Sequence, residues 1–115
     1  MIDSYEFGVI VIDGNRYTSD VIILSEKVID DWWRKEGHKL HLEDLEKILE
    51  HESKPEVLVV GTGYYGFVKV SPEINNALKS RGIEFIAQPS ENACQTFNQL
   101  LKSKRRVVGA FHLTC

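Results

Sequence analysis

Cysteine and long hydrophobic runs are both scarce in this sequence. Its 115 residues include two cysteines, Cys94 and Cys115, which are too few for a scaffold built on disulfides. We expect reduced thiols in a cytoplasm, although the sequence leaves a bridge between the two open. The longest apolar runs have four residues, whereas a membrane-spanning helix needs about 20. We therefore expect a cytoplasmic protein without a membrane span.

Positive charge is sparse where targeting signals carry it. Residues 1–20 hold four acidic side chains against Arg16 alone, and residues 1–4 lack the basic start of a signal peptide. We therefore expect neither a mitochondrial presequence nor a signal peptide. The net charge of −3 gives no general attraction to nucleic acid. A basic run at residues 102–106 indicates a solvated helix end, with a phosphate contact as the alternative, so a nucleic-acid partner is not expected.

Apolar residues, at 43% of the chain, suffice for one hydrophobic core. Asp13-Gly14 is typical of a hairpin turn, and Ser90 is expected to cap a helix. Strand patterns cover residues 7–12, 16–24, 57–60, 83–87 and 106–113, and helix patterns cover 41–53, 72–81 and 90–103. Strands that alternate with helices imply partly parallel pairing. The sequence therefore predicts a single layered α/β domain over residues 1–115.

A glycine-rich loop follows the most apolar strand. Residues 61–66 match G-x-G-x-x-G, but four further residues precede Ser71 and the helix, so the context of a dinucleotide site fails. The glycines instead indicate a sharp turn and close backbone approach. If strands 57–60 and 83–87 are neighbours, the start of the helix at Ser90 faces the loop and could bind a small anion or metabolite. The candidate ligand residues are Gly61, Thr62, Gly63, Tyr64, Tyr65, Ser90, Asn92 and Cys94.

Cys94 admits two interpretations. Near the start of a helix a thiol can become nucleophilic, and His112 on the last strand would be its base. The alternative is a structural thiol, because Cys94 shares the helix face of Phe97 and Leu101. No pair of Cys or His residues has the spacing of a zinc finger, so we expect no metal and no cofactor.

Trp32, Trp33 and Arg34 stand together in the least regular part of the chain. Adjacent residues of an extended segment point in opposite directions, so one tryptophan is expected to stay partly exposed. The three residues either pack over sheet edges or form a surface for a protein partner, since Trp and Arg are enriched at interface hot spots.

Three groups of residues together resemble a family of small α/β proteins of long-unknown function. They are Trp33-Arg34 with Gly37-His38; residues 59–63; and Gly82-Ile83-Glu84 leading to Ala93, Thr96-Phe97-Asn98, Leu100 and Arg106-Val107-Val108. The family occurs in archaea and bacteria. Its eukaryotic relatives include the adipogenesis-associated Mth-domain protein and assembly factor 3 of mitochondrial complex I. The resemblance covers about residues 5–113. It implies a three-layer domain with a mixed central sheet and an N-terminal β-hairpin packed beside it, and it implies no catalytic residues.

The sequence thus favours a non-enzymatic binding or assembly-type protein. We expect the protein to bind another protein. We also expect a cleft for a small ligand or anion at the glycine loop. The sequence leaves open whether the chain forms a homodimer. The competing hypothesis is an enzyme of unassigned reaction that uses the cleft between residues 61–66 and 90–94.

Overall fold

The computed structural model describes residues 1–51 and 55–115, and its centre is a five-stranded mixed sheet. The strand order is β5-β4-β10-β7-β9. In it, β10 (Val107–His112) lies parallel to β7 (Val57–Thr62), which lies parallel to β9 (Glu84–Gln88). On the other side of β10, β4 (Val21–Ile23) runs antiparallel to it and to β5 (Val28–Ile29). The mixed central sheet is therefore confirmed.

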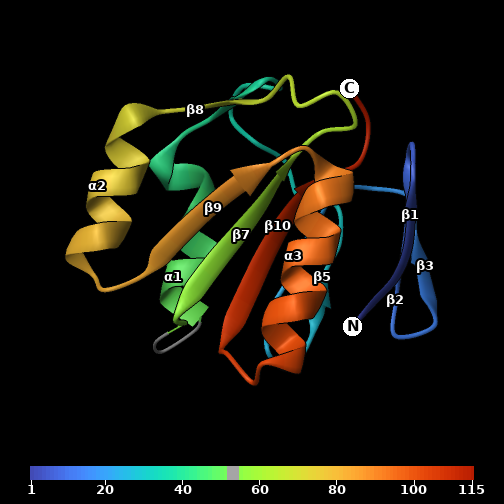
Figure 1. Cartoon of the computed structure of the whole chain (residues 1–115). Helices are drawn as coiled ribbons and strands as arrows, with labels where there is room; N and C mark the ends of the chain where they lie inside the picture. The colour runs from blue at the N-terminus through green and yellow to red at the C-terminus, as the bar shows by residue number, and fades with distance from the viewer. Residues whose placement is uncertain (52–54) are drawn as a thin grey trace.

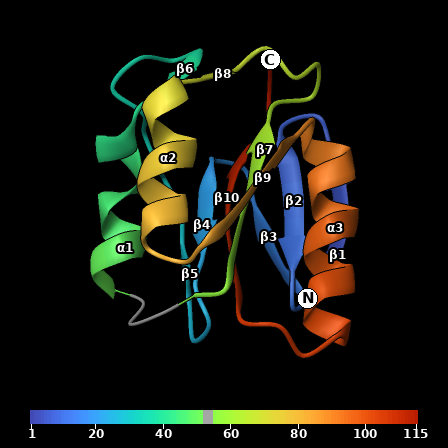
Figure 2. The same cartoon turned by 60° about the vertical axis from the view of Figure 1, so that its left-hand side comes forward.

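Two further layers cover this sheet (Figure 1). Helices α1 (Glu46–His51) and α2 (Pro72–Ser80) lie on one face, and helix α3 (Ser90–Lys102) lies on the other. A second, antiparallel sheet packs beside α3; it consists of β1 (Ile2–Glu6), β2 (Val9–Ile12) and β3 (Asn15–Tyr17). Figure 2 shows the three layers edge-on, with the central sheet between them. The layered α/β domain is as expected from the resemblance.

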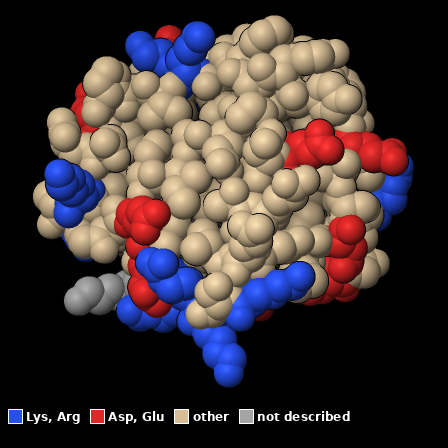
Figure 3. All heavy atoms as spheres, in the orientation of Figure 1, with Lys and Arg blue, Asp and Glu red and all other residues tan. Residues whose placement is uncertain are grey.

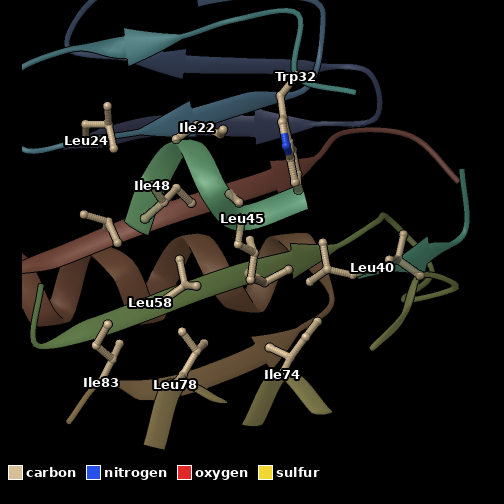
Figure 4. Packing of buried hydrophobic residues seen from close by; sticks show 14 residues of the cluster. Ile22, Leu24, Trp32, Leu40, Leu45, Ile48, Leu58, Ile74, Leu78 and Ile83 are labelled. Atoms are coloured by element: carbon tan, nitrogen blue, oxygen red, sulfur yellow. The ribbon is translucent and has the colours of Figure 1, made fainter. Parts of the chain in front are cut away.

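The central strands are apolar throughout because both of their faces are covered. All six residues of β7 and all six of β10 are buried. Leu58 and Val60 point into the core beneath α1 and α2, whereas Val57 and Val59 point into the core beneath α3. Figure 4 shows the first of these cores, with Trp32 and Leu45 converging on the sheet.

The hairpin turn at Asp13-Gly14 is confirmed, but the long return strand is wrong. Residues 16–24 divide into β3, in the small sheet, and β4, in the central sheet. The polar segment Thr18-Ser19-Asp20 separates them, and the Asp20 carboxylate bonds to groups of the central layer. Strand β1 was not predicted, because its one buried residue, Ile2, gives no apolar alternation.

Three other features differ from expectation: the start of one helix, the burial of one strand and the cap of another helix. The helix predicted at 41–53 begins as a 3₁₀-helix (Leu42–Leu45) and continues as α1, and residues 52–53 lie outside the described part of the chain. Strand β9 is half-exposed rather than buried, because it is an edge strand. Pro89, not Ser90, precedes the first turn of α3. Ser90 is fully buried, and its hydroxyl bonds to the main chain of other segments.

A short strand separates the glycine loop from the next helix. β8 (Lys69–Val70) pairs in parallel with β6 (Lys39–Leu40), and only then does α2 begin. The glycines therefore do not open a helix, in agreement with the rejection of a dinucleotide site. None of the helices within residues 1–51 and 55–115 has the length and apolar character needed to cross a membrane.

Candidate functional site

A cleft of about 280 Å³ opens beside the two tryptophans. Strand β10 and the segments on either side of β4 and β5 meet there, at the carboxyl end of β10. The lining residues are Thr18, Ser19, Asp20, Asp31, Trp32, Trp33, Arg34, His112 and Thr114. All three predicted partner residues, Trp32, Trp33 and Arg34, thus border one concave surface.

One tryptophan is buried and the other is exposed, as predicted. Trp32 is 6% exposed and belongs to the core beneath α1, where its indole N–H donates to the Asp44 carbonyl at 3.2 Å. Trp33 is 78% exposed, and its indole N–H donates to the Asp31 carboxylate at 3.1 Å. One tryptophan therefore holds the segment in the core, and the other is presented to solvent.

Asp20, Arg34 and His112 form a network of charged and polar side chains under the cleft. Arg34 Nη1 lies 2.9 Å and His112 Nδ1 lies 2.7 Å from the same oxygen, Asp20 Oδ2. The other carboxylate oxygen accepts the N–H of Leu113 at 2.9 Å. These side chains are 5%, 10% and 15% exposed for Arg34, His112 and Asp20. The guanidinium of Arg34 also lies 5.1 Å from the Trp32 ring centroid, within cation–π range.

The network fixes the charge of its carboxylate. Burial alone would raise the pKa of Asp20, but the hydrogen bonds from His112, Leu113 and Arg34 outweigh burial and lower it. An ionised carboxylate can only accept, and a guanidinium can only donate. His112 Nδ1 lies 2.7 Å from Asp20 Oδ2 and 3.0 Å from Arg34 Nη2, so the tautomer of His112 decides which of these two groups it bonds to. His112 Nε2 is buried and has no hydrogen-bond partner among the described residues. The contacts of the Asp20 carboxylate with Arg34 and His112 therefore hold these three cleft-lining side chains in place.

The inner side of the glycine loop packs tightly against α3 and β10. A β-carbon at Gly61 would lie 2.7 Å from both Ser90 Oγ and a ring carbon of Phe111. Gly63 has φ +105°, and a β-carbon there would lie 2.9 Å from the Thr114 carbonyl oxygen. The expected close approach of the backbone is confirmed at both glycines.

The loop and the start of α3 are neighbours, as predicted. The Ser90 hydroxyl donates to the His112 carbonyl and accepts the Gly63 N–H at 3.0 Å. The Ser90 N–H in turn donates to the Gly63 carbonyl at 2.9 Å. Gly61, Thr62, Gly63 and Ser90 are all buried at this junction.

The main-chain donors of the loop are largely used within the protein. The N–H groups of Tyr64, Gly66 and Val68 donate to the carbonyls of Thr114, Gly63 and Thr62 at 2.9, 3.1 and 3.0 Å. Among the predicted ligand residues, Tyr64, Tyr65 and Asn92 are exposed. The anion site stays a prediction, and an anion there would compete with these internal bonds.

Cys94 lies in the core rather than at a surface. It is 7% exposed, and burial, followed by the charge of Glu91, raises the pKa of its thiol to about 12. Cys94 packs in the cluster of Phe111 and Leu113, whereas His112 continues the opposite face of β10 after Val108 and Ala110. Cys94 and Cys115 are both free thiols. The geometry favours the structural interpretation of Cys94.

The basic run at 102–106 is partly neutralised. Arg105 Nε lies 3.1 Å and Arg106 Nε lies 3.7 Å from the Glu56 carboxylate. Arg105 also reaches Glu84, at 3.7 Å. Two of the four basic side chains in the run thus have acidic partners, which weakens the case for a phosphate contact.

Sequence reasoning missed Asp20 and the aromatic neighbours of the loop, Phe7 and Phe67. Asp20 carried one signal, since it ends a polar interruption of an otherwise apolar stretch. Phe7 and Phe67 each adjoin a glycine, as Tyr65 does. These signals show that the residues are unusual, but not that they meet other segments.

A family model described as "Protein of unknown function (DUF498/DUF598)" matches residues 2–112. The chain belongs to this family. The sequence is 34% identical over 110 residues to NADH dehydrogenase (ubiquinone) 1 alpha subcomplex assembly factor 3 of Mus musculus, covering 95% of this chain and 57% of that protein. The Homo sapiens protein of the same name is also 34% identical over 110 residues, with 95% and 58% covered. The chain therefore spans less than two thirds of these relatives.

The fold is shared with a solved structure over the whole chain. The crystal structure of the conserved hypothetical protein PH1505 from Pyrococcus horikoshii OT3 superposes with a TM-score of 0.84 at 30% sequence identity. The match covers 100% of this chain and 99% of that one. The family resemblance read from the sequence is thus confirmed.

Proposed function

We propose that this protein is a non-enzymatic binding domain that assists the assembly of a multi-subunit protein complex. The mouse and human relatives are named as assembly factors, and the similarity covers 95% of this chain. Assembly requires recognition of protein partners, so the contact surface is the feature to identify. The partner itself is a proposal, because the relatives extend beyond the aligned region.

The main support for this proposal is the exposure of Trp33. A tryptophan that is 78% exposed is unusual for a residue so often buried, and Trp is a frequent hot spot of protein interfaces. Its neighbours fix its position: Trp32 lies in the core, and Arg34 is bonded to Asp20. In this proposal Trp33 contacts the partner, whereas Trp32 and Arg34 hold it beside the cleft.

Three finer predictions accompany the proposal. A cytoplasmic location is supported by two free cysteines, which fit a reducing compartment. A homodimer and a small anion at the glycine loop stay predictions. The high pKa of the Cys94 thiol, about 12, counts against Cys94 as a nucleophile, because the thiolate is scarce at neutral pH.

The test compares tagged wild-type protein with Trp33→Ala in the source organism, using quantitative mass spectrometry of the co-purifying proteins. Asn76→Ala, at an exposed position of α2, is the matched control. We expect subunits of one complex to co-purify with wild type and control and to fall about tenfold with Trp33→Ala. The same protein set with all three baits, or no complex subunits at all, would contradict the proposal.

A further inference from the structure

Four exposed aromatic side chains gather at one end of the molecule. They are Phe7, Tyr64, Tyr65 and Phe67, at 49%, 44%, 58% and 54% exposure, and we call them the aromatic patch. Phe7 lies in the turn between β1 and β2. Tyr64 and Tyr65 lie in the glycine loop, and Phe67 follows the loop directly. Both segments reach the upper end of the molecule in Figure 1. Two segments that are distant in sequence thus build one surface.

The rings contact one another in a continuous chain. Tyr64 meets Phe7 at 5.5 Å and Tyr65 at 5.0 Å between ring centroids, both edge to face. Tyr65 stacks on Phe67 at 5.4 Å, with 29° between the ring planes. Single exposed apolar residues are ordinary, but contiguous apolar patches on monomers are often functional.

The backbone under the patch is held in place. The Gly8 N–H donates to the Leu113 carbonyl at 2.9 Å, and the Tyr64 N–H donates to the Thr114 carbonyl at 2.9 Å. The bond from Gly66 N–H to the Gly63 carbonyl closes the loop between them. A surface that is already ordered loses little conformational freedom on binding, which favours affinity.

We propose that the aromatic patch binds a short apolar segment of a partner protein that carries an arginine or lysine. This inference rests on the proposed function and names the surface that recognises the partner. It adds a second contact region to that of Trp33.

The size of the patch favours a short segment over a second copy of the chain. Four half-exposed aromatic rings present roughly 400 Å². A stable dimer buries about 800 Å² on each partner. The patch therefore suits the side chains of a short segment better than a self-association interface.

Charge at the edge of the patch indicates the basic residue. Exposed Glu6 precedes Phe7 directly, and exposed Glu91 lines a cleft with Tyr5, whose ring lies 6.4 Å from that of Tyr64. In Figure 3 the upper surface is mostly free of charged side chains, with acidic groups to its right and basic groups at its upper left. Aromatic faces also attract cations. The basic residue of the partner is expected at the Glu6 end, because Lys69 follows Phe67 at the other end.

The test selects binders from a phage-displayed random dodecapeptide library on the immobilised full chain. The variant Tyr65→Ser/Phe67→Ser serves for counter-selection, and an unchanged melting temperature shows that it is folded. We expect an enriched motif of apolar residues with one Arg or Lys. Synthetic peptides of that motif should bind the double variant at least about tenfold more weakly, and should also weaken with Glu6→Lys. Lys79→Ala, at an exposed position in the last turn of α2, is the matched control and should leave binding unchanged.

Absence of a motif, an acidic motif, or peptides that bind wild type and double variant equally would overturn the inference. A wild-type chain that sediments as a dimer and becomes monomeric with the double variant would also overturn it. The two proposals fail separately. If complex subunits co-purify through Trp33 but no peptide depends on the patch, the patch proposal alone falls.

Discussion

Residues 31–34, which we call the Trp33 segment, and the glycine loop both hold aromatic side chains in solvent near the carboxyl end of β10. They do so by different chemistry. The Trp33 segment depends on charged side chains, since Asp20, Arg34 and His112 bond beneath it. The glycine loop depends on the main chain and on the absence of side chains, since Gly61 and Gly63 touch their neighbours directly. The two regions should therefore respond to different perturbations: the first to changes of charge and pH, the second to an added methyl group.

The largest effect is expected from Asp20→Asn. Removing one charge of a buried pair leaves the Arg34 guanidinium uncompensated, and such changes cost about 3 to 5 kcal/mol of unfolding free energy. Urea denaturation at neutral pH measures the loss. Glu43→Gln is the matched control, because its pair with Lys35 is solvent-exposed and should cost less than about 1 kcal/mol. Equal losses for the two variants would remove the distinction between network and surface charge.

The glycine loop is tested by Gly63→Ala. The left-handed backbone costs an alanine about 1 to 2 kcal/mol, and the contact with the Thr114 carbonyl adds to it, so we expect about 2 to 3 kcal/mol in total. Gly82→Ala is the control, since φ is +75° there but a β-carbon would meet no described atom within 4 Å. Its expected cost is about 1 kcal/mol. If Gly63→Ala costs no more than the control, the tight packing of the loop is not what fixes it.

Acid should reduce the contribution that Asp20 makes to the free energy of unfolding. The pKa of Asp20 is lower in the folded protein than its ordinary value, so its contribution is complete above the unfolded pKa of about 4 and is lost as pH falls through the folded pKa. The difference in unfolding free energy between wild type and Asp20→Asn should therefore shrink from neutral pH toward pH 3. Other carboxylates cancel in this difference. For Gly63→Ala the same difference should stay constant, and a parallel pH dependence in both would argue against the comparison.

The smallest effects are expected at the exposed rings themselves. Trp33→Ala and Tyr65→Ala should each change the unfolding free energy by no more than about 0.5 kcal/mol, because both side chains are largely exposed. Trp32→Ala is the control for a buried neighbour and should cost about 3 to 5 kcal/mol. Thermal and urea denaturation measure all three. A large loss with Trp33→Ala would mean that this ring supports the fold and would weaken its role as a binding contact.

The elements that the sequence predicted best are those whose pattern is local. Strand β7 is an unbroken apolar run, and α3 repeats its buried residues at helical spacing, with Ala93 and Phe97 on one face. The close packing at the glycines was also predictable, because a residue without a β-carbon allows a sharp turn and a close approach of the backbone.

The candidate site was only partly predictable because its contacts are distant in sequence. Asp20 bonds to Arg34 and His112, which are 14 and 92 residues away, and no local pattern connects them. The division of residues 16–24 between two sheets has the same cause. Similarly, Phe7 meets Tyr64 only because the β1–β2 turn is fixed on Leu113. Adjacent Trp32 and Trp33 could be predicted to diverge, but not which of them is buried.

The position of β10 has a consequence for how the molecule forms. This strand follows all the others in the chain, yet it lies between β4 and β7 at the middle of the sheet. In the described structure β10 is the strand that joins β4 to β7, so each of these two strands has an open edge until residues 107–112 pair with it. Unpaired strand edges invite wrong partners. We therefore expect the pairing of β10 with β4 and β7 to be a late step in the folding of the central sheet.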